Sequence, residues 1–184
     1  HPDGGPFGQF DRLAAHLSDQ GKTLHFAMNA GMYHQDRRPV GLYIENGEQI
    51  APLVTREGPG NFGMLPNGVF WTDAEGKAHV TESLAFQAVA AEAVFATQSG
   101  PMLVINGALH PDFNADGPSR KRRNGVGVSA DGTIHFAISD APVNFHSFAT
   151  LFRDRLDTPN ALFLDGFISK LYAPDLGRNE TGLD

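Results

Sequence analysis

The sequence contains no cysteine among its 184 residues. This absence excludes disulfide bridges and metal sites built on thiolates, and it fits either the cytosol or an export compartment. No apolar run approaches the length of a membrane-spanning helix, so the sequence predicts no such helix. Basic residues are also in the minority, with 14 Lys and Arg against 21 Asp and Glu and a net charge of −7. That balance argues against general nucleic-acid binding.

What the sequence does contain is the composition of a folded globular chain, 41% hydrophobic and 19% charged. This length fits one domain with a substantial core, so we expect a single domain over residues 1–184. Because the chain begins with His rather than Met and ends on a polar segment, we expect it to be trimmed at both ends. Any signal peptide would then already be removed.

Turn residues between alternating apolar runs indicate a mainly antiparallel sheet. Asn-Gly at 46–47 and 106–107 and Asp-Gly at 131–132 are strong hairpin signals. Apolar residues at helical spacing predict helices only at residues 7–19 and 145–156. We therefore predict an α+β fold, a mainly antiparallel twisted sheet built from hairpins with few helices.

Residues 161–172, ALFLDGFISKLY, place a carboxylate directly after an apolar stretch. Ala161 to Leu164 are all apolar, which predicts a buried strand. Asp-Gly is the commonest hairpin turn, so one interpretation is that Asp165 and Gly166 connect two paired strands. The other is that the buried strand holds the Asp165 carboxylate rigidly, as catalysis requires. These residues alone leave both open and favour the turn.

The basic residues gather at Arg120, Lys121, Arg122 and Arg123. A solvated loop is the ordinary interpretation of a charge run. However, this run leads into the strand-like segment NGVGVS, and side chains alternate along a strand, so only some of the arginines can face one pocket. Arginine binds phosphate or carboxylate oxygens through paired donors. Anion binding by one or two of these arginines is therefore an equal alternative.

Polar residues also stand beside small residues at predicted strand ends, such as Asn29 in NAGMY and Gln98 and Ser99 in QSGP. Such residues often satisfy turn backbone, but close backbone approach at glycine also suits a sugar or phosphate site. The eight histidines show no metal-ligand spacing, so no metal site is predicted. The histidine of most interest is His146, which lies near Asp140 and just ahead of a helix.

The segment GPGNFG at 58–63 matches the dinucleotide fingerprint in letters only. The fingerprint requires a helix directly after the glycines, whereas MLPNG follows here. The sequence therefore argues against nucleotide binding at this segment.

Several short motifs occur in a characteristic order: NAGMY, GPGNF, PNGVF, ATQSGPMLV, RRNGVGVSADG, FAISDAPVNF and ALFLDGFISKLY. In this combination, over about residues 23–172, the chain resembles the phosphodiester glycosidase family, and especially bacterial members linked to exopolysaccharide. Two segments depart from the family pattern. NAGMY replaces an Asn-Gly-Gly-Phe-Phe type segment, and residues 165–170 keep the Asp and one Ser of Asp-Gly-Gly-Gly-Ser-Ser but lose its later glycines.

The resemblance implies a hydrolase that cleaves the bond between an anomeric carbon and a phosphate in a bacterial glycan or glycoconjugate. This reaction needs charge stabilisation on the departing phosphate and a carboxylate or water on the sugar side. With this context, the catalytic interpretation of Asp165 becomes the favoured one, and we expect no cofactor and no metal. The expected catalytic residues are Asp165, Asp140 and His146. The expected substrate- or phosphate-binding residues are Asn29, Gln98, Ser99, Arg120, Arg123, Asn124 and Ser169.

The resemblance also implies a sugar-phosphodiester or phosphorylated glycan as the partner and a periplasmic or extracellular location, with the cytoplasm as the alternative. We expect Asn29, Gln98, Asp140 and Asp165 to approach one cleft. Two other functions stay open. A non-catalytic module that binds anionic glycan would need the arginines but no carboxylate pair. A phosphodiesterase that cuts the phosphorus–oxygen bond would usually need a metal or a nucleophile.

Overall fold

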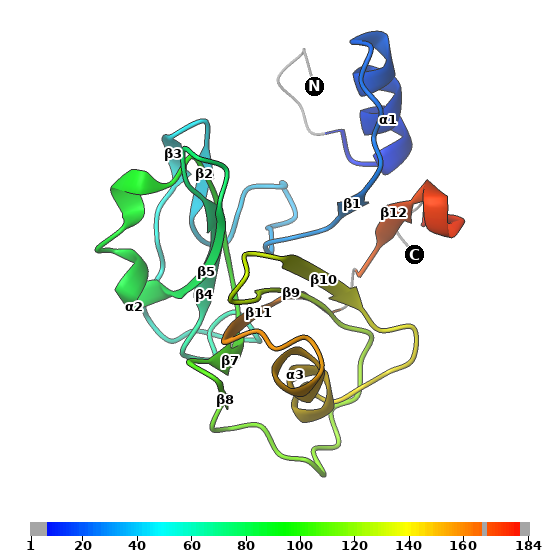
Figure 1. Ribbon diagram of the computed structural model, residues 1–184. Coiled ribbons are helices and arrows are strands. Elements are labelled where there is room, and N and C mark those ends of the chain that lie inside the picture. The colour runs from blue at the N-terminus through cyan, green and yellow to red at the C-terminus, as the bar shows by residue number, and fades with distance from the viewer. Residues whose placement is uncertain (1–6, 167–168, 181–184) are drawn as a thin grey trace. The chain divides into compact units, whose positions relative to one another are not determined.

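Short hairpins organise most of the chain in the computed structural model, which describes residues 7–166 and 169–180. The chain divides into two units. The first unit combines both ends of the chain, His1–Asn29 and Ile168–Asp184, and the second is Ala30–Phe167. Figure 1 shows the elements of each unit with their labels.

The first unit is a helix with a small sheet. Its elements are α1 (Phe10–Asp19), β1 (Ala27–Met28), β12 (Leu171–Ala173), a 3-10 helix (Pro174–Leu176) and β13 (Arg178–Asn179). The sheet is antiparallel, in the order β1-β12-β13. The helix contacts this sheet through the rings of Phe10 and Tyr172, whose centroids are 6.2 Å apart. A hydrogen bond of 3.0 Å from Asn179 Nδ2 to Asp11 Oδ1 adds a polar contact.

The second unit holds two five-stranded sheets. One has the order β3-β2-β6-β4-β5, with strands Tyr43–Glu45 (β2), Glu48–Ala51 (β3), Gly68–Thr72 (β4), Ala78–Glu82 (β5) and Phe95–Ser99 (β6). The other has the order β10-β9-β11-β7-β8, with strands Met102–Ile105 (β7), Ala108–Leu109 (β8), Asn124–Val128 (β9), Ile134–Ile138 (β10) and Asn160–Asp165 (β11). The helical elements are α2 (Ser83–Phe86), a 3-10 helix (Ala90–Glu92) and α3 (Phe145–Asp154).

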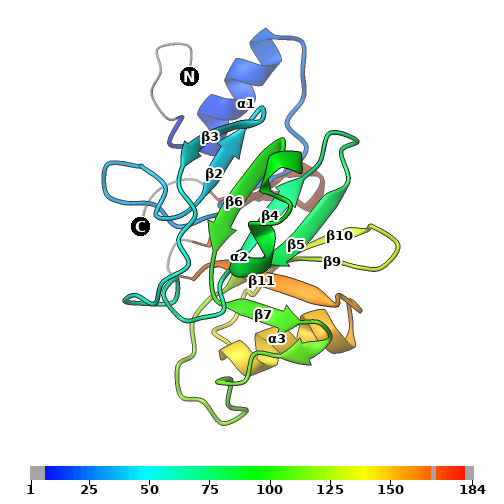
Figure 2. The ribbon, with the colours of Figure 1, turned by 90° about the vertical axis from the view of Figure 1, so that its left-hand side faces the viewer.

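Each sheet of the second unit has its own apolar core. Around the first sheet, the core includes Leu42, Ile44, Val69, Trp71 and Phe86. The Trp71 ring stacks on His79, with centroids 4.2 Å apart, and its indole N–H donates to Thr81 Oγ1 at 2.9 Å. Figure 2 shows α2 beside β4 and β5 of this sheet.

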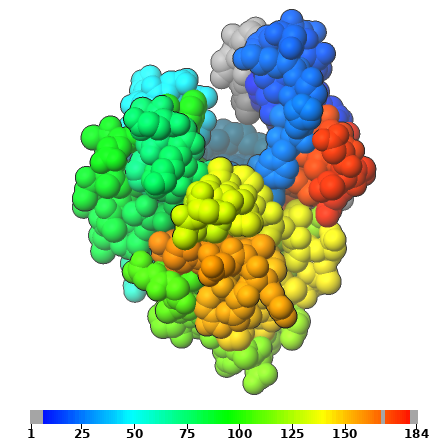
Figure 3. Space-filling model, viewed as in Figure 1, coloured from blue at the N-terminus to red at the C-terminus, as the bar shows by residue number. Residues whose placement is uncertain are grey.

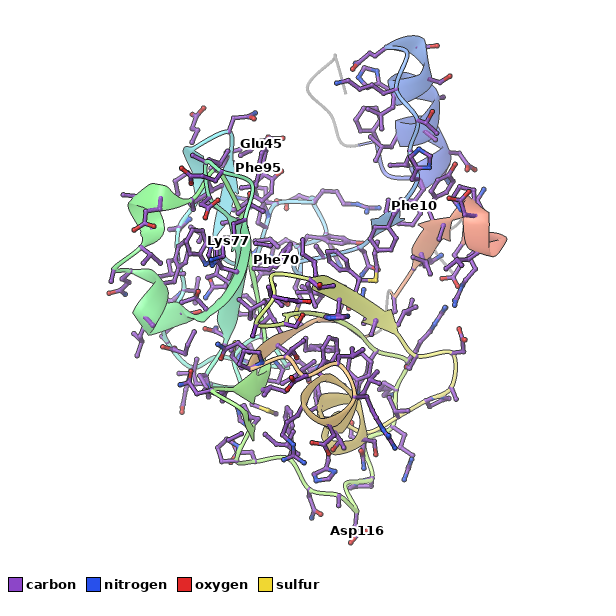
Figure 4. All side chains as sticks on the ribbon, in the orientation of Figure 1. Phe10, Glu45, Phe70, Lys77, Phe95 and Asp116 are labelled. Atoms are coloured by element: carbon purple, nitrogen blue, oxygen red, sulfur yellow. The ribbon has the colours of Figure 1, made fainter. Side chains whose placement is uncertain are left out.

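The second core lies between α3 and its sheet. The buried rings of Phe148 and Phe152 on the helix belong to the same cluster as Leu103, Val104 and Phe163 of the strands. In the space-filling view, the orange atoms of α3 and of the loop after it lie below the yellow-green atoms of the β9–β10 hairpin (Figure 3). The two sheets also touch directly. Figure 4 labels Phe70 beside β10, where its ring meets Phe136 edge-on at 5.7 Å.

The predicted α+β class with mainly antiparallel strands is confirmed, since every strand pairing recorded within the described residues is antiparallel. The predicted helices at 7–19 and 145–156 correspond to α1 and α3.

The interpretation of Asp165-Gly166 as a hairpin turn is wrong. Asp165 and Gly166 do not connect two paired strands, because β11 pairs with β7 and β9, whereas β12 pairs with β1 and β13. The stretch at 58–63 is followed by turns and β4, without a helix.

Candidate active site at the strand ends

Three neighbouring strands bring polar residues together at one end of the second sheet. The central strand β9 begins at Asn124, which lies opposite Ile138 at the end of β10 and opposite Asp165 at the end of β11. Asp140 follows β10 by two residues and is exposed to solvent. Antiparallel pairing thus places two carboxylate residues on either side of one strand terminus. We call Asn124, Ser139, Asp140 and Asp165 the strand-end cluster.

Hydrogen bonds hold Asp165 in a defined position. Its backbone N–H donates to Asn124 Oδ1 at 2.6 Å, and its Oδ1 accepts the N–H of Gly166 at 2.6 Å. The preceding residue is fixed as well, because the buried Ser99 hydroxyl donates to the Leu164 carbonyl at 2.7 Å. Asp165 itself is half-buried. Ser99 and Asn124 therefore position the strand end that carries this carboxylate.

Ser139 joins the basic segment to the same place. Its Oγ accepts the N–H of Arg123 at 2.9 Å, and its own N–H donates to the Arg123 carbonyl at 2.8 Å. Arg122 Nε donates to the Ser139 carbonyl at 3.3 Å. Sequence reasoning missed Ser139 and did not select Arg122. The available signal for Ser139 was its position directly before Asp140, after an apolar predicted strand.

Arg123 is a buried cation, with 1% of its surface exposed. Its Nε donates to the Val143 carbonyl at 2.9 Å and its Nη2 to the Ser119 carbonyl at 3.0 Å. The guanidinium lies 3.5 Å from the Phe145 ring centroid and 5.6 Å from that of Phe163. Burial lowers the pKa of Arg123 to about 10, so the group stays charged at neutral pH. These contacts tie together the 119–124 segment, the loop before α3 and the core.

Arg120 and His146 differ from the cluster in their surroundings. Arg120 is exposed, and the described part of the chain records no hydrogen bond or ion pair for it. His146 is half-buried in the first turn of α3, and its carbonyl accepts from Thr150 Oγ1 at 2.8 Å. No hydrogen bond from its ring to the strand-end cluster is recorded in residues 7–166.

Gln98 is the centre of a second, buried network. Its Oε1 accepts the N–H groups of Leu42 and Val54, each at 3.0 Å. Its Nε2 lies within hydrogen-bond distance of the Val54 carbonyl (2.6 Å), Ser83 Oγ (2.9 Å) and Asn67 Oδ1 (3.2 Å). A primary amide has two donor hydrogens and two acceptor lone pairs. The protein therefore uses the full hydrogen-bonding capacity of this side chain, and we call the set the Gln98 network.

A cavity of about 240 Å³ borders the Gln98 network. It is lined by Thr55, by residues 65–67 and by residues 82–84. Asn67 and Ser83 are fully buried in its wall. None of these residues was selected from the sequence. The only local signal was the Pro-Asn-Gly turn at 66–68.

His110 holds the backbone of Leu65, one of the residues that line this cavity. Its Nε2 donates to the Leu65 carbonyl at 3.0 Å, and its Nδ1 accepts the N–H of Asp112 at 3.2 Å. This pattern requires a neutral ring, and burial lowers the pKa of His110. The ring stacks on Phe113 at 4.7 Å, which stacks on Phe145 at 4.9 Å.

Asn29 and Ser169 belong to the first unit. Asn29 Oδ1 accepts the N–H of Lys170 at 2.7 Å, so Asn29 lies beside the segment that carries the buried Ser169. The other predicted site residues belong to the second unit. The expectation that Asn29 shares a cleft with Asp165 therefore stays a prediction.

The described residues form neither a metal-ligand cluster nor a membrane-spanning helix. Within residues 7–166 and 169–180, no three His, Asp or Glu side chains gather where a metal ion would bind them. In the same residues, no helix has the length and apolar character needed to cross a membrane.

Comparisons with known proteins give consistent matches. The family model described as "Phosphodiester glycosidase" matches residues 22–181. Protein YigE of Escherichia coli (strain K12) is 39% identical over 170 residues, which cover 92% of this chain and 66% of that protein. The catalytic domain of zebrafish N-acetylglucosamine-1-phosphodiester alpha-N-acetylglucosaminidase, auto-inhibited by its pro-peptide, superimposes with a TM-score of 0.64 at 17% identity. That match covers 90% of this chain and 57% of the zebrafish chain, so this chain spans only part of either relative.

Proposed function

Since this chain belongs to the phosphodiester glycosidase family, we propose that it hydrolyses the glycosyl–phosphate bond of a sugar-1-phosphodiester in a bacterial glycan or glycoconjugate. The single observation that supports a site is the convergence of Asp165, Asn124 and Asp140 at the ends of three adjacent strands. The zebrafish relative is, by its name, an enzyme of this class. The Escherichia coli relative supports a bacterial setting.

The reaction assigns distinct roles to the two carboxylates. The bond between the anomeric carbon and the phosphate oxygen breaks, that oxygen leaves with the phosphomonoester, and water supplies the new hydroxyl on the sugar. Asp165 is held by Asn124 and Gly166 and serves on the sugar side, where positive charge develops on the ring. Asp140, which is exposed, assists proton transfer to or from water. A phosphomonoester is a better leaving group than an alkoxide, so the demand on a general acid is modest.

The departing phosphate requires positive charge. Arg123 already donates to two carbonyls and stacks on Phe145, so in this proposal it positions the 119–124 segment and adds to the local positive potential. Arg120 is exposed and directly binds the phosphate oxygens, with paired donors that match them. His146 stays a candidate proton donor that must reach the substrate from α3.

The remaining predicted residues position protein segments around the site or orient the substrate. Ser99 and Asn124 hold the strand end that carries Asp165. Gln98 uses its amide within the protein, so its contribution is to hold the segments around it. Asn29 and Ser169 orient substrate hydroxyl or phosphate oxygens.

The family model spans parts of both units, from residue 22 to residue 181. This span supports the proposal that residues 1–184 work as a single phosphodiester-glycosidase domain. We further propose a periplasmic or extracellular location and a role in exopolysaccharide metabolism, with a phosphorylated glycan as the substrate. The alternative is a binding module for anionic glycan.

Isotope labelling separates these functions in one experiment. The protein is incubated with the methyl phosphodiester of N-acetylglucosamine-1-phosphate in water enriched in oxygen-18, and the products are analysed by mass spectrometry. A glycosidase places the label on the sugar and leaves methyl phosphate unlabelled. Label in the phosphate indicates phosphorus–oxygen cleavage instead. Binding without turnover, tested on a panel of sugar phosphodiesters, supports the binding module and overturns the enzymatic proposal.

A further inference from the structure

The cavity beside the Gln98 network has walls that are suited to a ligand and are not used by the proposed reaction. Gln98 and Ser99 are consecutive residues of β6, and successive strand residues face opposite sides of a sheet. Gln98 contacts the cavity-lining Asn67 and Ser83, whereas Ser99 contacts Leu164 beside the strand-end cluster. The cavity and the backbone of Leu164 therefore lie on opposite sides of β6.

The polar part of the cavity wall retains donors that the protein does not use. Ser83 Oγ accepts a hydrogen bond from Gln98, but no described residue is recorded as accepting the Ser83 hydroxyl hydrogen. Asn67 Nδ2 gives one hydrogen to the Phe62 carbonyl at 3.2 Å, and its amide carries a second. Both side chains are fully buried, where an unused donor is costly unless a ligand or water accepts it.

The wall also provides acceptors and an apolar face. The Glu82 carboxylate accepts the N–H groups of Leu84 and Ala85 at 3.0 and 3.1 Å, and each oxygen keeps a further lone pair. Leu65 and Pro66 contribute aliphatic surface. A ligand that fits must therefore present both hydroxyl donors and acceptors together with a face of C–H groups.

The charge of the lining and the volume of the cavity limit the class of ligand further. Among the described residues that line the cavity, Glu82 is the only charged one and none is Lys or Arg, so the wall disfavours phosphate and other anions. The volume of about 240 Å³ lies below the roughly 300–1,000 Å³ of pockets for drug-sized ligands. It corresponds to about eight water molecules at roughly 30 Å³ each. One six-membered sugar ring suits this space, whereas a chain of rings does not.

We propose that this cavity is a non-catalytic binding site for one neutral pyranose ring. Asn67, Ser83 and Glu82 bind its hydroxyl groups, and Leu65 and Pro66 pack against its C–H face. The site is preorganised, because hydrogen bonds from Gln98 and His110 hold its wall residues in position. This assignment does not depend on the hydrolysis proposed above, since the site requires no carboxylate pair and no phosphate.

Solution NMR tests the site directly. The ¹⁵N-labelled full chain is titrated separately with methyl β-glucopyranoside and with glucuronic acid as its methyl β-glycoside, a matched pair that differs only in the C6 carboxylate. We expect the neutral sugar to shift the backbone amides of Leu65, Asn67 and residues 82–84 in a saturable way. The glucuronic acid glycoside should bind several-fold more weakly because of Glu82. Saturable shifts confined to the strand-end cluster, or no saturable shift with methyl glucosides, galactosides and mannosides alike, would overturn the proposal.

Three variants and one control variant show whether the sugar binds in this cavity. Thr55→Phe should fill the cavity and abolish the shifts, whereas the control Thr23→Phe, at an exposed position in the first unit, should leave them unchanged. Ser83→Ala removes one hydroxyl and should weaken binding about three- to tenfold, the usual effect of one hydrogen bond. A thermal melt of each variant shows whether it is folded, and if Thr55→Phe is not folded, Ser83→Ala alone decides the test.

Asp165→Asn should leave sugar binding unchanged. Binding lost in Asp165→Asn but retained in Thr55→Phe would assign the sugar to the strand-end cluster and reject the cavity.

Discussion

The strand-end cluster and the Gln98 network are both made of polar side chains near strand ends, yet they differ in their exposure to solvent. In the cluster, Asp140 is exposed and Asp165 is half-buried, with its carboxylate accepting the N–H of Gly166. In the network, Gln98 is buried and uses all of its donors and acceptors on the protein. The comparison teaches that exposure and hydrogen bonding after folding, and not residue type alone, decide whether a polar side chain stays accessible to solvent or is used within the protein.

The largest expected effect is on turnover in Asp165→Asn. Asparagine retains an oxygen for the N–H of Gly166 but carries no negative charge and accepts no proton. We expect hydrolysis of a sugar-1-phosphodiester to fall about 10²- to 10⁴-fold, with melting temperature and substrate affinity nearly unchanged. The control is Asp116→Asn, in an exposed loop. Normal turnover in Asp165→Asn would remove the residue from catalysis and favour Asp140.

Gln98→Ala should act on stability instead. The change removes the contacts of the Gln98 network and leaves the buried N–H of Leu42 and the half-buried N–H and carbonyl of Val54 without their partner. We expect the free energy of unfolding to fall by about 3 kcal/mol, since each buried unsatisfied group costs about 1–3 kcal/mol. Chemical denaturation measures this loss. Gln87→Ala, on the exposed end of α2, is the matched control, and equal stability of the two variants would contradict the network's structural role.

Substitutions of Arg120 and Arg123 should likewise differ, with one affecting substrate binding and the other affecting stability. Arg120→Ala should weaken substrate binding without changing stability, because the side chain is exposed. Arg123→Lys should lose about 2 kcal/mol of stability, because lysine cannot make both carbonyl contacts and stack on Phe145 in the same way. Activity assays beside denaturation curves measure both effects. Full activity in the double variant Arg120→Ala, Arg123→Ala would reject a role for either residue in phosphate binding.

The smallest expected effect is a pH dependence from His110. Burial lowers the pKa of His110, so the folded protein resists protonation that the unfolded chain accepts near its ordinary value of about 6.5. The stability that the neutral ring provides is therefore complete above that pH and decreases as the pH falls below it. Thermal melts at pH 7.5 and 5.5 should differ less in His110→Phe than in the unsubstituted protein. His34→Phe, at an exposed position, should retain the full difference. An unchanged difference in His110→Phe would exclude this residue as its source.

Local patterns predicted the parts of the fold that depend on local contacts. The hairpin of β9 and β10 closes around Asp131 and Gly132, where turn geometry and strand pairing involve neighbouring residues. The pairing of β11 could not be predicted from such patterns. Its partners β9 and β7 come much earlier in the chain, and Asp165-Gly166 resembles a hairpin turn although no hairpin forms there.

The candidate site was predictable to a similar degree. Asp165 and Asn124 were selected and lie opposite each other on β11 and β9, and Asp140, also selected, follows β10, the other neighbour of β9; their role as a site stays a prediction. Gln98 was selected as a ligand-binding residue because it stands near a glycine in the sequence. Its contacts to residues 42, 54, 67 and 83 come from segments distant in sequence, so no local pattern could show that its amide is already in use.

The stacking of Trp71 on His79 has a consequence for experiments on folding. Trp71 is the only tryptophan in the chain, and it is buried in the first sheet of the second unit. Its fluorescence therefore reports on that unit alone, whereas circular dichroism reports on helices and strands throughout the chain. Coincident transitions by the two methods are the mark of a single cooperative unfolding event. A far-ultraviolet change that precedes the tryptophan emission change would show that the segment formed by the two chain ends melts on its own, with no label or added probe.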